Sequence, residues 1–370
     1  MIFYAYIGYP LSLYLVSLIK RNQTNHPEEA AHHTVSLLIS AYNEEKVIDE
    51  KIKNSLSLSY PPSLLEIVVV SDGSTDRTEE IVKQYSDQGV ILRSYQGRIG
   101  KTACLNEAVP LAKGEIVVFS DANSRYDKNA IKELVRHFGD DQIGFVTGKT
   151  EYVSGNGSNV FSPINFYSKL EIFVKNLESK ISSCVGADGA IFAIRKKLFK
   201  ALSDADINDL VIPLKIIKQG YKGILEEKAF CIENSANGYK DEFRRQERIT
   251  NRTIRAIFND SDMLNPFKFG LFSFELFSHK ISKFLVPFFM ITLLIANLFL
   301  ITKGPFFLLF LTGQLAFYLL AVLGYFRKCW ISLSKVISPC RTFLVVNLAI
   351  LNGWVKYLKG DTYTTWTTLR

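Results

Sequence analysis

The stretch "EIVVVSDGSTDRTEEIVKQYS", residues 66–86, decides the fold class of this chain. Its first part is a continuous apolar run that ends in Ser71 and Asp72, and its second part, from Ser74, has the pattern of a capped helix. A strand that is apolar on both faces is typical of a parallel sheet with helices on either side. The stretch therefore predicts one strand–helix unit of an α/β domain.

The same alternation of strands and helices continues over residues 34–260. Further strands are expected in "VSLLISA", "VILRSY", "EIVVFSD" and "IGFVTGK". Ligands of such sheets bind beyond the carboxyl ends of the strands. The strand ends would gather these side chains at one edge: Glu44, Asp72, Asp121 and Asn123, with Lys101 nearby. Helix capping is an alternative for Asp72 and Ser74, but it does not predict acids at three strand ends. The pattern favours a nucleotide site.

A second stretch, "YQGRIGKTACLNEAV" at residues 95–109, tests whether that site belongs to an ATPase. Gly100-Lys101-Thr102 matches the end of a phosphate-binding P-loop. The P-loop also requires a glycine where this chain has Tyr95, and Gly97 closes the turn too soon. The ATPase interpretation is therefore disfavoured.

Composition points towards a membrane. The chain has 370 residues, a net charge of +8, 48% hydrophobic residues and 27 phenylalanines. Its five cysteines are scattered without metal-binding spacing, which is typical of a reduced, cytosol-facing protein.

The apolar segments divide the chain into zones. The first apolar run is followed by Lys20 and Arg21, which favours an anchor with its carboxyl end in the cytosol over a cleaved signal peptide; a buried globular helix is the alternative. Residues 284–301 and 305–326 are long enough to form a spanning hairpin. The run "TFLVVNLAILNGWV" could span, re-enter or lie in the interface. The expected zones are 1–21 membrane helix, 22–33 linker, 34–260 catalytic domain, 261–283 amphipathic interface segment, 284–358 membrane helices and 359–370 tail.

Seven motifs in order carry a resemblance to a known family. They are "SLLISAYNEEKVI", "EIVVVSDGSTDRT", "GKTACLNEAV", "IVVFSDANS", "CVGADGAIFAIRKKLF", "INDLVIPLKIIKQGYKGILEE" and "EFRRQERITNRTIRAI". Together they resemble glycosyltransferase family 2, in its membrane-anchored, inverting, polysaccharide-synthesising branch. The resemblance implies the GT-A fold, a Rossmann-like and mostly parallel sheet with flanking transmembrane or interfacial helices. It also implies transfer of a sugar from a nucleotide sugar, expected to be a UDP-sugar, to a hydroxyl of a lipid-linked or growing polysaccharide.

The resemblance assigns roles on the donor side. Asp72 would contact the base or ribose, and Glu44 would line the same pocket. Lys101 would stand beside the donor. The family's DxD motif corresponds to Asp121-Ala122-Asn123, so Asp121 and Asn123 would hold Mg²⁺ or Mn²⁺.

On the acceptor side, the resemblance makes Asp209 the general base, with Asn208 in place of the usual acid before it. Asp206 is a rival, and helix capping is the alternative for Asp209. Asp188 in "GADGA" would face the acceptor, or would simply form a tight turn.

Arg245 and Arg248 would pair with the diphosphate, although a solvated face or lipid headgroups could also occupy them. Ile249 replaces the tryptophan of the family's Gln-x-x-Arg-Trp motif, which leaves processive synthesis open.

The expected partners are a nucleotide sugar, a lipid-linked or polysaccharide acceptor and membrane lipids, with no nucleic acid. The expected location is the plasma membrane, with the catalytic domain in the cytoplasm. Two other functions stay open. One is a polyprenyl-phosphate sugar synthase, whose phosphate acceptor needs no strong base. The other is a transporter or scaffold with a degenerate nucleotide-binding domain, which the lack of charge in the apolar runs disfavours.

Overall fold

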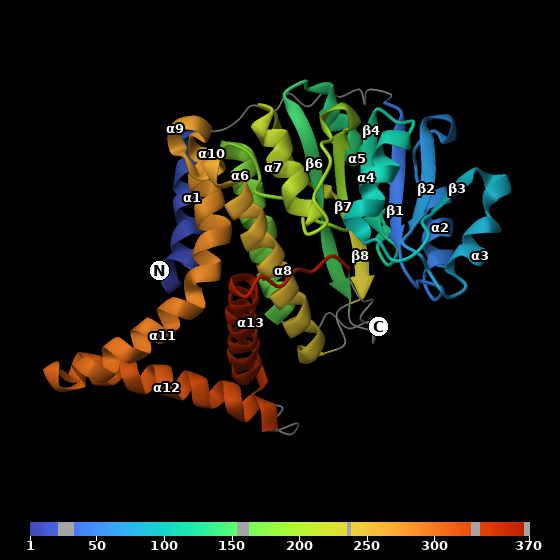
Figure 1. Ribbon diagram of the computed structural model, residues 1–370. Helices are drawn as coiled ribbons and strands as arrows, with labels where there is room; N and C mark the ends of the chain where they lie inside the picture. Colours follow the sequence, from blue (N-terminus) through green and yellow to red (C-terminus); the bar gives the residue numbers. More distant parts are fainter. Residues whose placement is uncertain (21–32, 154–162, 235–237, 327–333, 366–370) are drawn as a thin grey trace.

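The computed structural model describes residues 1–20, 33–153, 163–234, 238–326 and 334–365 (Figure 1). The predicted linker at 22–33 therefore lies almost wholly outside the described residues. The centre of the molecule is a mixed eight-stranded sheet in the order β3-β2-β1-β4-β7-β6-β8-β5. Its strands are β1 (Val35–Ala41), β2 (Leu65–Ser71), β3 (Val90–Ser94), β4 (Ile116–Asp121), β5 (Arg125–Tyr126), β6 (Ile143–Val153), β7 (Ile191–Arg195) and β8 (Lys222–Asn234).

The first half of the sheet confirms the parallel prediction. β3, β2, β1 and β4 are mutually parallel, and Val35 to Ala41 pair in register with Leu65 to Ser71. The second half is mixed, because β7 runs antiparallel to both β4 and β6, and β5 runs antiparallel to β8. The expectation of a mostly parallel sheet therefore holds for the half that contains the predicted strand ends.

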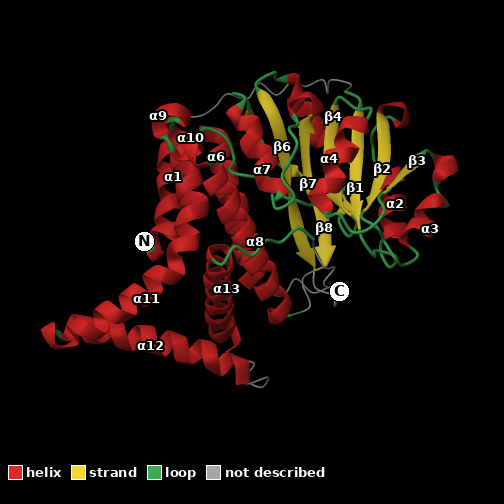
Figure 2. Cartoon of the chain, in the orientation of Figure 1, coloured by secondary structure: helices red, strands yellow, loops and turns green. Residues whose placement is uncertain are grey.

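Helices cover both faces of the sheet (Figure 2). They are α2 (Ile48–Leu56), α3 (Thr78–Lys83), α4 (Lys101–Leu111), α5 (Ala130–Val135), α6 (Pro163–Ile181), α7 (Asn208–Lys218) and α8 (Tyr239–Asn259). Successive strand residues point to opposite faces, so Leu37 and Ile39 join the core beneath α2, α3 and α5, whereas Leu38 joins the core beneath α4, α7 and α8. This double burial explains the uninterrupted apolar runs of the strands.

The chain also forms helices outside this domain. They are η1 (Tyr4–Gly8), α1 (Tyr9–Ile19), α9 (Pro266–Phe269), α10 (Leu271–Leu276), η7 (Phe277–Ile281), α11 (Ser282–Leu300), α12 (Pro305–Phe326) and α13 (Ser334–Leu358). Short 3₁₀ turns complete the elements: η2 (Pro62–Leu64), η3 (Ser86–Gln88), η4 (Arg136–Gly139), η5 (Lys196–Leu198), η6 (Ser261–Leu264) and η8 (Ile301–Lys303).

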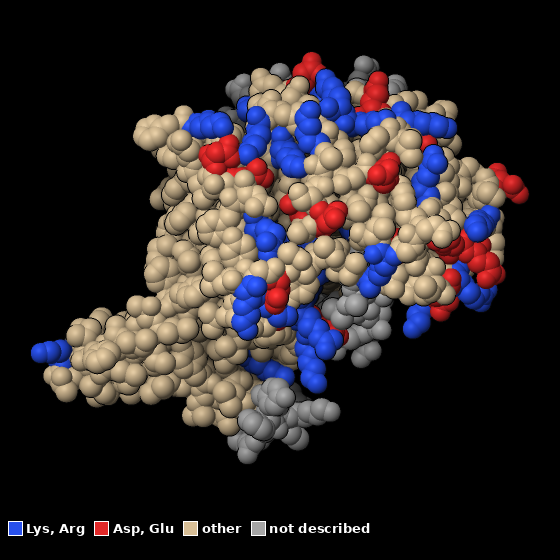
Figure 3. Space-filling view, viewed as in Figure 1, with Lys and Arg blue, Asp and Glu red and all other residues tan. Residues whose placement is uncertain are grey.

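Two helices are long and apolar enough to cross a membrane, Leu271–Lys303 and Pro305–Gly324. They form an arm that extends away from the sheet (Figure 1), and the visible face of that arm is almost free of charged side chains (Figure 3). The helix that contains the first candidate span begins at Leu271, inside the segment 261–283 that the sequence assigns to the interface. The boundary at residue 284 stays a prediction.

The sequence left two interpretations of the amino-terminal helix open, an anchor and a buried globular helix. Tyr4–Ile19 is an apolar helix shorter than the two candidate spans, and a bilayer requires about 20 residues. Tyr9 and Leu13 pack against Val174, Leu177 and Ile181 of α6. The helix is thus attached along one side to the catalytic domain.

The last helix also packs on the catalytic domain. Gly353 of α13 lies so close to α8 that an added Cβ would approach Thr250 to 2.8 Å and the carbonyl oxygen of Glu247 to 3.0 Å. A larger residue would separate the two helices at this crossing. The close crossing places the end of α13 beside the turn of α8 that contains Glu247 and Thr250.

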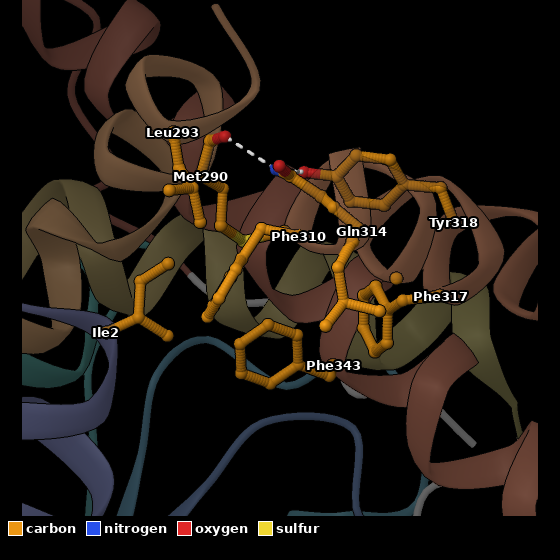
Figure 4. Close-up of a pocket in the computed structure, with 10 residues that line it drawn as sticks. Ile2, Met290, Leu293, Phe310, Gln314, Phe317, Tyr318 and Phe343 are labelled. Atoms are coloured by element: carbon orange, nitrogen blue, oxygen red, sulfur yellow. Dashed lines mark hydrogen bonds between the residues drawn. The ribbon is translucent and has the colours of Figure 1, made fainter. Parts of the chain in front are cut away.

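A cavity of about 520 Å³ lies between α11, α12 and α13 (Figure 4). Apolar side chains line it, including Met290, Phe310 and Phe343, and Gln314 donates a hydrogen bond to the Met290 carbonyl oxygen across 3.0 Å. None of the predicted site residues lines this cavity. The chemistry must therefore be sought at the edge of the sheet.

Candidate active site

The loops after β1 and β2 are fastened to each other at the carboxyl edge of the sheet. Asn43 adopts a left-handed backbone conformation, with φ of 53°, and its side-chain oxygen accepts a hydrogen bond from the Thr75 amide across 2.8 Å. The Glu44 amide donates to the Thr78 hydroxyl across 2.7 Å, and the Glu44 side chain is buried. The loop that contains Glu44 is therefore fixed against the loop that begins at Asp72.

Asp72 has one carboxylate oxygen engaged and one free. Its Oδ1 accepts a hydrogen bond from the Gly100 amide across 2.9 Å. Its Oδ2 is buried, and no residue in the described part of the chain is bonded to it. A buried acceptor without a partner is costly, so this oxygen is suited to a donor group of a ligand.

Sequence analysis missed two residues that flank Asp72 on the neighbouring strand ends. The Arg98 guanidinium lies 4.0 Å from the ring centre of Tyr42. Its Nε and Nη2 are buried and have no hydrogen-bond partner among the residues described. The loops after β1 and β3, on either side of the loop that contains Asp72, thus offer an aromatic ring and unpaired cationic donors.

Lys101 and Asp121 form an ion pair, with 2.5 Å between Nζ and Oδ1. Lys101 is the first residue of α4 and Asp121 is the last residue of β4, so the pair joins two of the predicted strand ends. Asp121 keeps 37% of its side chain exposed, against 18% for Lys101. The Lys101 cation therefore occupies one carboxylate oxygen of Asp121, the residue that sequence analysis predicts to bind a metal.

A turn places Asn123 and Ser124 directly after Asp121, with the Ser124 amide donating to the Asp121 carbonyl oxygen across 3.2 Å. The Ser124 hydroxyl donates to Glu233 of β8, which sequence analysis also missed. Burial and the charge of Asp121 raise the pKa of Glu233 to about 7. In the described part of the chain, no three His, Cys, Asp or Glu side chains are arranged to hold a metal ion, so a metal at Asp121 would need oxygens from a ligand.

Asp209 lies in the first turn of α7 and does not cap it. Ile207 occupies the capping position and makes no side-chain cap bond. The Ala187 amide donates to the Asp209 carbonyl oxygen across 2.7 Å, and a Cβ on Gly189 would lie 3.1 Å from Oδ2. The other carboxylate oxygen, Oδ1, is buried without a partner among the described residues.

The rival acid Asp206 is occupied by its own turn. Its Oδ2 accepts a hydrogen bond from the Ser203 amide across 2.8 Å. Its carbonyl oxygen accepts from the Thr102 hydroxyl across 3.0 Å and from the Arg252 guanidinium. Of the two acids, Asp209 is the one with a buried carboxylate oxygen that has no partner among the described residues.

The Asp188 carboxylate is fully engaged within the protein. It accepts hydrogen bonds from the Thr150 amide and hydroxyl, at 3.0 and 2.9 Å, and from the Ala190 amide at 3.1 Å. Burial raises the pKa of this carboxyl group. These contacts hold the loop before β7 against β6, and the acceptor-side role of Asp188 stays a prediction.

Three arginines lie on one face of α8. Arg245 donates to the Tyr152 hydroxyl across 3.3 Å. Burial and Arg245 lower the pKa of Arg248, whereas Asp121 and Asp209 act in the opposite direction. Arg248 is therefore within electrostatic reach of both acids.

Arg252 is the third arginine of that face, and sequence analysis missed it. It is buried, and it donates to the Thr102 hydroxyl across 3.1 Å, which joins α8 to α4. Its spacing of four residues from Arg248 was the available signal, because residues four apart share a helix face.

The carboxyl-terminal residues lie on the same region. The Asp361 carbonyl oxygen accepts hydrogen bonds from Asn251 and Arg255, at 3.2 and 2.9 Å. The Tyr363 hydroxyl donates to Glu247 of α8. Gly100 has φ of 97°, and an added Cβ there would collide with the Thr364 carbonyl oxygen. Residues 361–365, called the tail segment below, thus run from α13 across α8 to the start of α4.

Comparison with known proteins identifies the domain. The model of "Glycosyl transferase family 2" matches residues 36–203. This chain carries a glycosyltransferase domain of family 2. The match includes β1, β2, β4 and the strand ends that hold Asp72 and Asp121.

Two curated relatives illustrate the range of the family. The chain is 36% identical over 116 residues to the beta-monoglucosyldiacylglycerol synthase of Nostoc sp., which covers 30% of this chain and 25% of that protein. It is 26% identical over 206 residues to the poly-beta-1,6-N-acetyl-D-glucosamine synthase of Staphylococcus aureus, with 53% and 49% covered. The chain thus spans between about a quarter and a half of these relatives.

A solved structure matches almost the whole chain. The mannosyltransferase PcManGT from Pyrobaculum calidifontis, solved with GDP-Man and Mn²⁺, is 23% identical, with a TM-score of 0.70 and 96% of each chain covered. This similarity confirms the GT-A glycosyltransferase fold.

Proposed function

We propose that the chain is a membrane-bound, inverting glycosyltransferase that moves a sugar from a nucleotide sugar, most simply a UDP-sugar, to a hydroxyl of a lipid-linked or growing polysaccharide. One observation carries this proposal: the buried, unpartnered Oδ1 of Asp209. A carboxylate of this kind, kept free at the edge that binds ligands, is suited to take a proton from an incoming group.

The donor would lie along the ends of β1, β2 and β4. The free Oδ2 of Asp72 can accept a hydrogen bond from the N–H of a base such as uracil. The ring of Tyr42 and the unpaired donors of Arg98 flank that position. Lys101 and Arg248 supply positive charge for a diphosphate, so the departing nucleotide is stabilised by groups of the chain itself.

Asp121 and Asn123 can bind a divalent ion, although Lys101 already occupies one oxygen of Asp121. Asp121 is partly exposed and has one oxygen away from Lys101, and Asn123 can add an amide oxygen. When bound there, Mg²⁺ or Mn²⁺ would supply positive charge that neutralises the diphosphate. The remaining ligands would have to come from the diphosphate and water.

The acceptor hydroxyl would approach from the side of Asp209. Its oxygen forms a bond to the anomeric carbon while the bond from that carbon to the nucleotide oxygen breaks, and Asp209 takes the hydroxyl proton. Attack opposite the departing group inverts the anomeric centre. A lipid phosphate acceptor would need no such base, so the free oxygen of Asp209 favours a hydroxyl acceptor over the polyprenyl-phosphate alternative.

The membrane role rests on the two candidate spans and on the names of the relatives, one a glycolipid synthase and one a polysaccharide synthase. The cytoplasmic position of the catalytic domain follows from the need for nucleotide sugars, which are made in the cytosol.

The test is nucleotide release by the detergent-purified chain. UDP-, GDP- and ADP-sugars are each supplied with Mg²⁺, Mn²⁺ or chelator, with lipid extracts as acceptor source. We expect one donor to give metal-dependent release, and Asp209→Asn to lower the rate by about 10²- to 10⁴-fold while nucleotide binding is kept. Unchanged turnover in Asp209→Asn would remove the base assignment, and absence of nucleotide binding would remove the proposed transferase.

A further inference from the structure

A buried cluster of charged side chains joins the catalytic domain to the helices at the membrane side. His279 of η7 is fully buried, with Nδ1 at 2.7 Å from Glu178 Oε1 and Nε2 at 2.6 Å from Glu171 Oε1. Both glutamates belong to α6. Both ring nitrogens therefore face carboxylate oxygens, which a ring with two N–H groups can satisfy.

Glu178 is the member of this cluster that faces in two directions. Its Oε1 accepts hydrogen bonds on the membrane side, from His279 and, across 2.6 Å, from the Tyr9 hydroxyl of α1. Its Oε2 accepts a hydrogen bond from the Val185 amide across 3.0 Å, on the catalytic side. Glu178 itself is completely buried.

The loop that Glu178 contacts at Val185 is itself bonded to Asp209. Val185 begins the loop of residues 185–190, and the Lys175 ammonium holds the same loop by donating to the Ala187 carbonyl oxygen across 3.1 Å. The Ala187 amide in turn donates to the Asp209 carbonyl oxygen. Gly189 of this loop lies against the Asp209 carboxylate.

These contacts give the membrane-side helices a way to affect the chemistry. A catalytic group that is displaced by about 1 Å can lose about 10²-fold in rate. The loop has its backbone fixed by α6 at Val185 and Ala187, and the outer end of Glu178 is fixed by α1 and η7. The position of Asp209 therefore depends on helices that lie outside the nucleotide-binding part of the domain.

We propose that Glu178 is a positioning residue through which α1 and η7 hold the loop of residues 185–190 and, with it, Asp209. The inference rests on the proposed role of Asp209 as the base. It assigns to the amino-terminal helix a part in turnover.

The test compares Glu178→Gln with Glu171→Gln. Glu171 belongs to the same cluster, bonded to His279 and, across 2.9 Å, to Lys283, but it has no bond to the loop. We expect Glu178→Gln to lower kcat by about ten- to a hundred-fold, with the donor KM and the affinity for the nucleotide unchanged. We expect Glu171→Gln to keep kcat within about threefold. Equal losses of kcat in the two variants would overturn the proposal.

A double variant separates positioning from general damage. If Glu178 acts through Asp209, adding Glu178→Gln to Asp209→Asn will not reduce the residual turnover further. A second, multiplicative loss would overturn the proposal. Full activity of Asp209→Asn would instead show that the base assignment has failed.

A milder change covers the case in which Glu178→Gln does not fold. Lys175→Met removes the bond to the Ala187 carbonyl oxygen together with the charge of the ammonium, and it keeps the aliphatic packing of that side chain. A lowered kcat at constant donor KM would support the fixed loop, and an unchanged kcat would contradict it.

Discussion

Glu226 on β8 shows how much a single buried carboxylate can contribute to this fold. It is 2.5 Å from Arg136 Nη2 and 2.7 Å from His137 Nε2, both in the turn that follows α5, and only 10% of its side chain is exposed. Burial alone would raise its pKa, but hydrogen bonds from His137, the Lys228 amide and Arg136 together lower it to about 2.

The sign of this shift predicts a pH dependence of stability. A carboxyl group with a lowered pKa stabilises the fold above its unfolded pKa, and that contribution is lost as the pH falls from about 4.5 to about 2. We expect Glu226→Gln to lower the free energy of unfolding by about 1–3 kcal/mol at neutral pH and to remove this part of the acid sensitivity. Thermal unfolding of wild type and Glu226→Gln over that pH range measures the loss of stability. The same loss of stability with falling pH in both proteins would contradict the prediction.

The sequence was enough to predict which residues form the candidate site. It was not enough to predict which of their oxygen atoms lack a hydrogen-bond partner. Asp72, Asp121 and Asp209 were named because they follow strands or begin a helix in a familiar order. Asp188 looked equivalent, yet its oxygens are engaged by Thr150 and Ala190. Which oxygen stays unpaired depends on contacts between distant segments, and no local pattern contains that information.

At the scale of elements, the parallel half of the sheet was predictable because each strand is a local apolar run followed by a helix. β5, β7 and β8 were not predicted, and neither was the antiparallel pairing of β7, because these features depend on pairing between segments far apart in the chain. The tail segment was also missed, since its position is set by contacts with α8 and α4 rather than by its own polar sequence.

The tail segment carries a testable prediction. The Tyr363 hydroxyl is bonded to Glu247 and lies 2.8 Å from Lys356 Nζ, so it fastens the segment beside the donor loop at Gly100. We expect Tyr363→Phe to raise the donor KM by about three- to tenfold, because a hydrogen bond contributes about 0.5–1.5 kcal/mol net. Steady-state kinetics measures this, with Thr362→Ala as control, an exposed neighbour in the same segment. Equal donor KM values in Tyr363→Phe and wild type would show that this bond of the tail segment does not contribute to donor binding.

At the scale of the whole molecule, α11 and α12 form a hairpin whose two ends lie near the catalytic domain and whose tip, at η8, lies far from it (Figure 1). If the hairpin crosses the bilayer, Lys303 at the tip must face the side opposite to the catalytic domain. The two sides can then be told apart by chemical labelling.

We expect Lys303→Cys to react with a membrane-impermeant maleimide in intact cells. Asp87→Cys, on the exposed surface of the catalytic domain, should react only after the cells are permeabilised. The parent chain is the control for its own thiols, of which Cys104, Cys184 and Cys231 are buried. Labelling of Asp87→Cys in intact cells would contradict the cytoplasmic orientation, and failure of Lys303→Cys to react there would contradict a crossing hairpin.

The contact between Thr364 and Gly100 has a consequence for the timing of synthesis. The ribosome makes the domain around Gly100 well before α11, α12 and α13, and domains begin to fold as they emerge. The segment that lies on the donor loop is made only after these helices. A newly made chain would therefore complete the proposed donor site only after the two candidate spans have been made. If these spans insert into a membrane, the proposed sugar transfer would be delayed until that insertion.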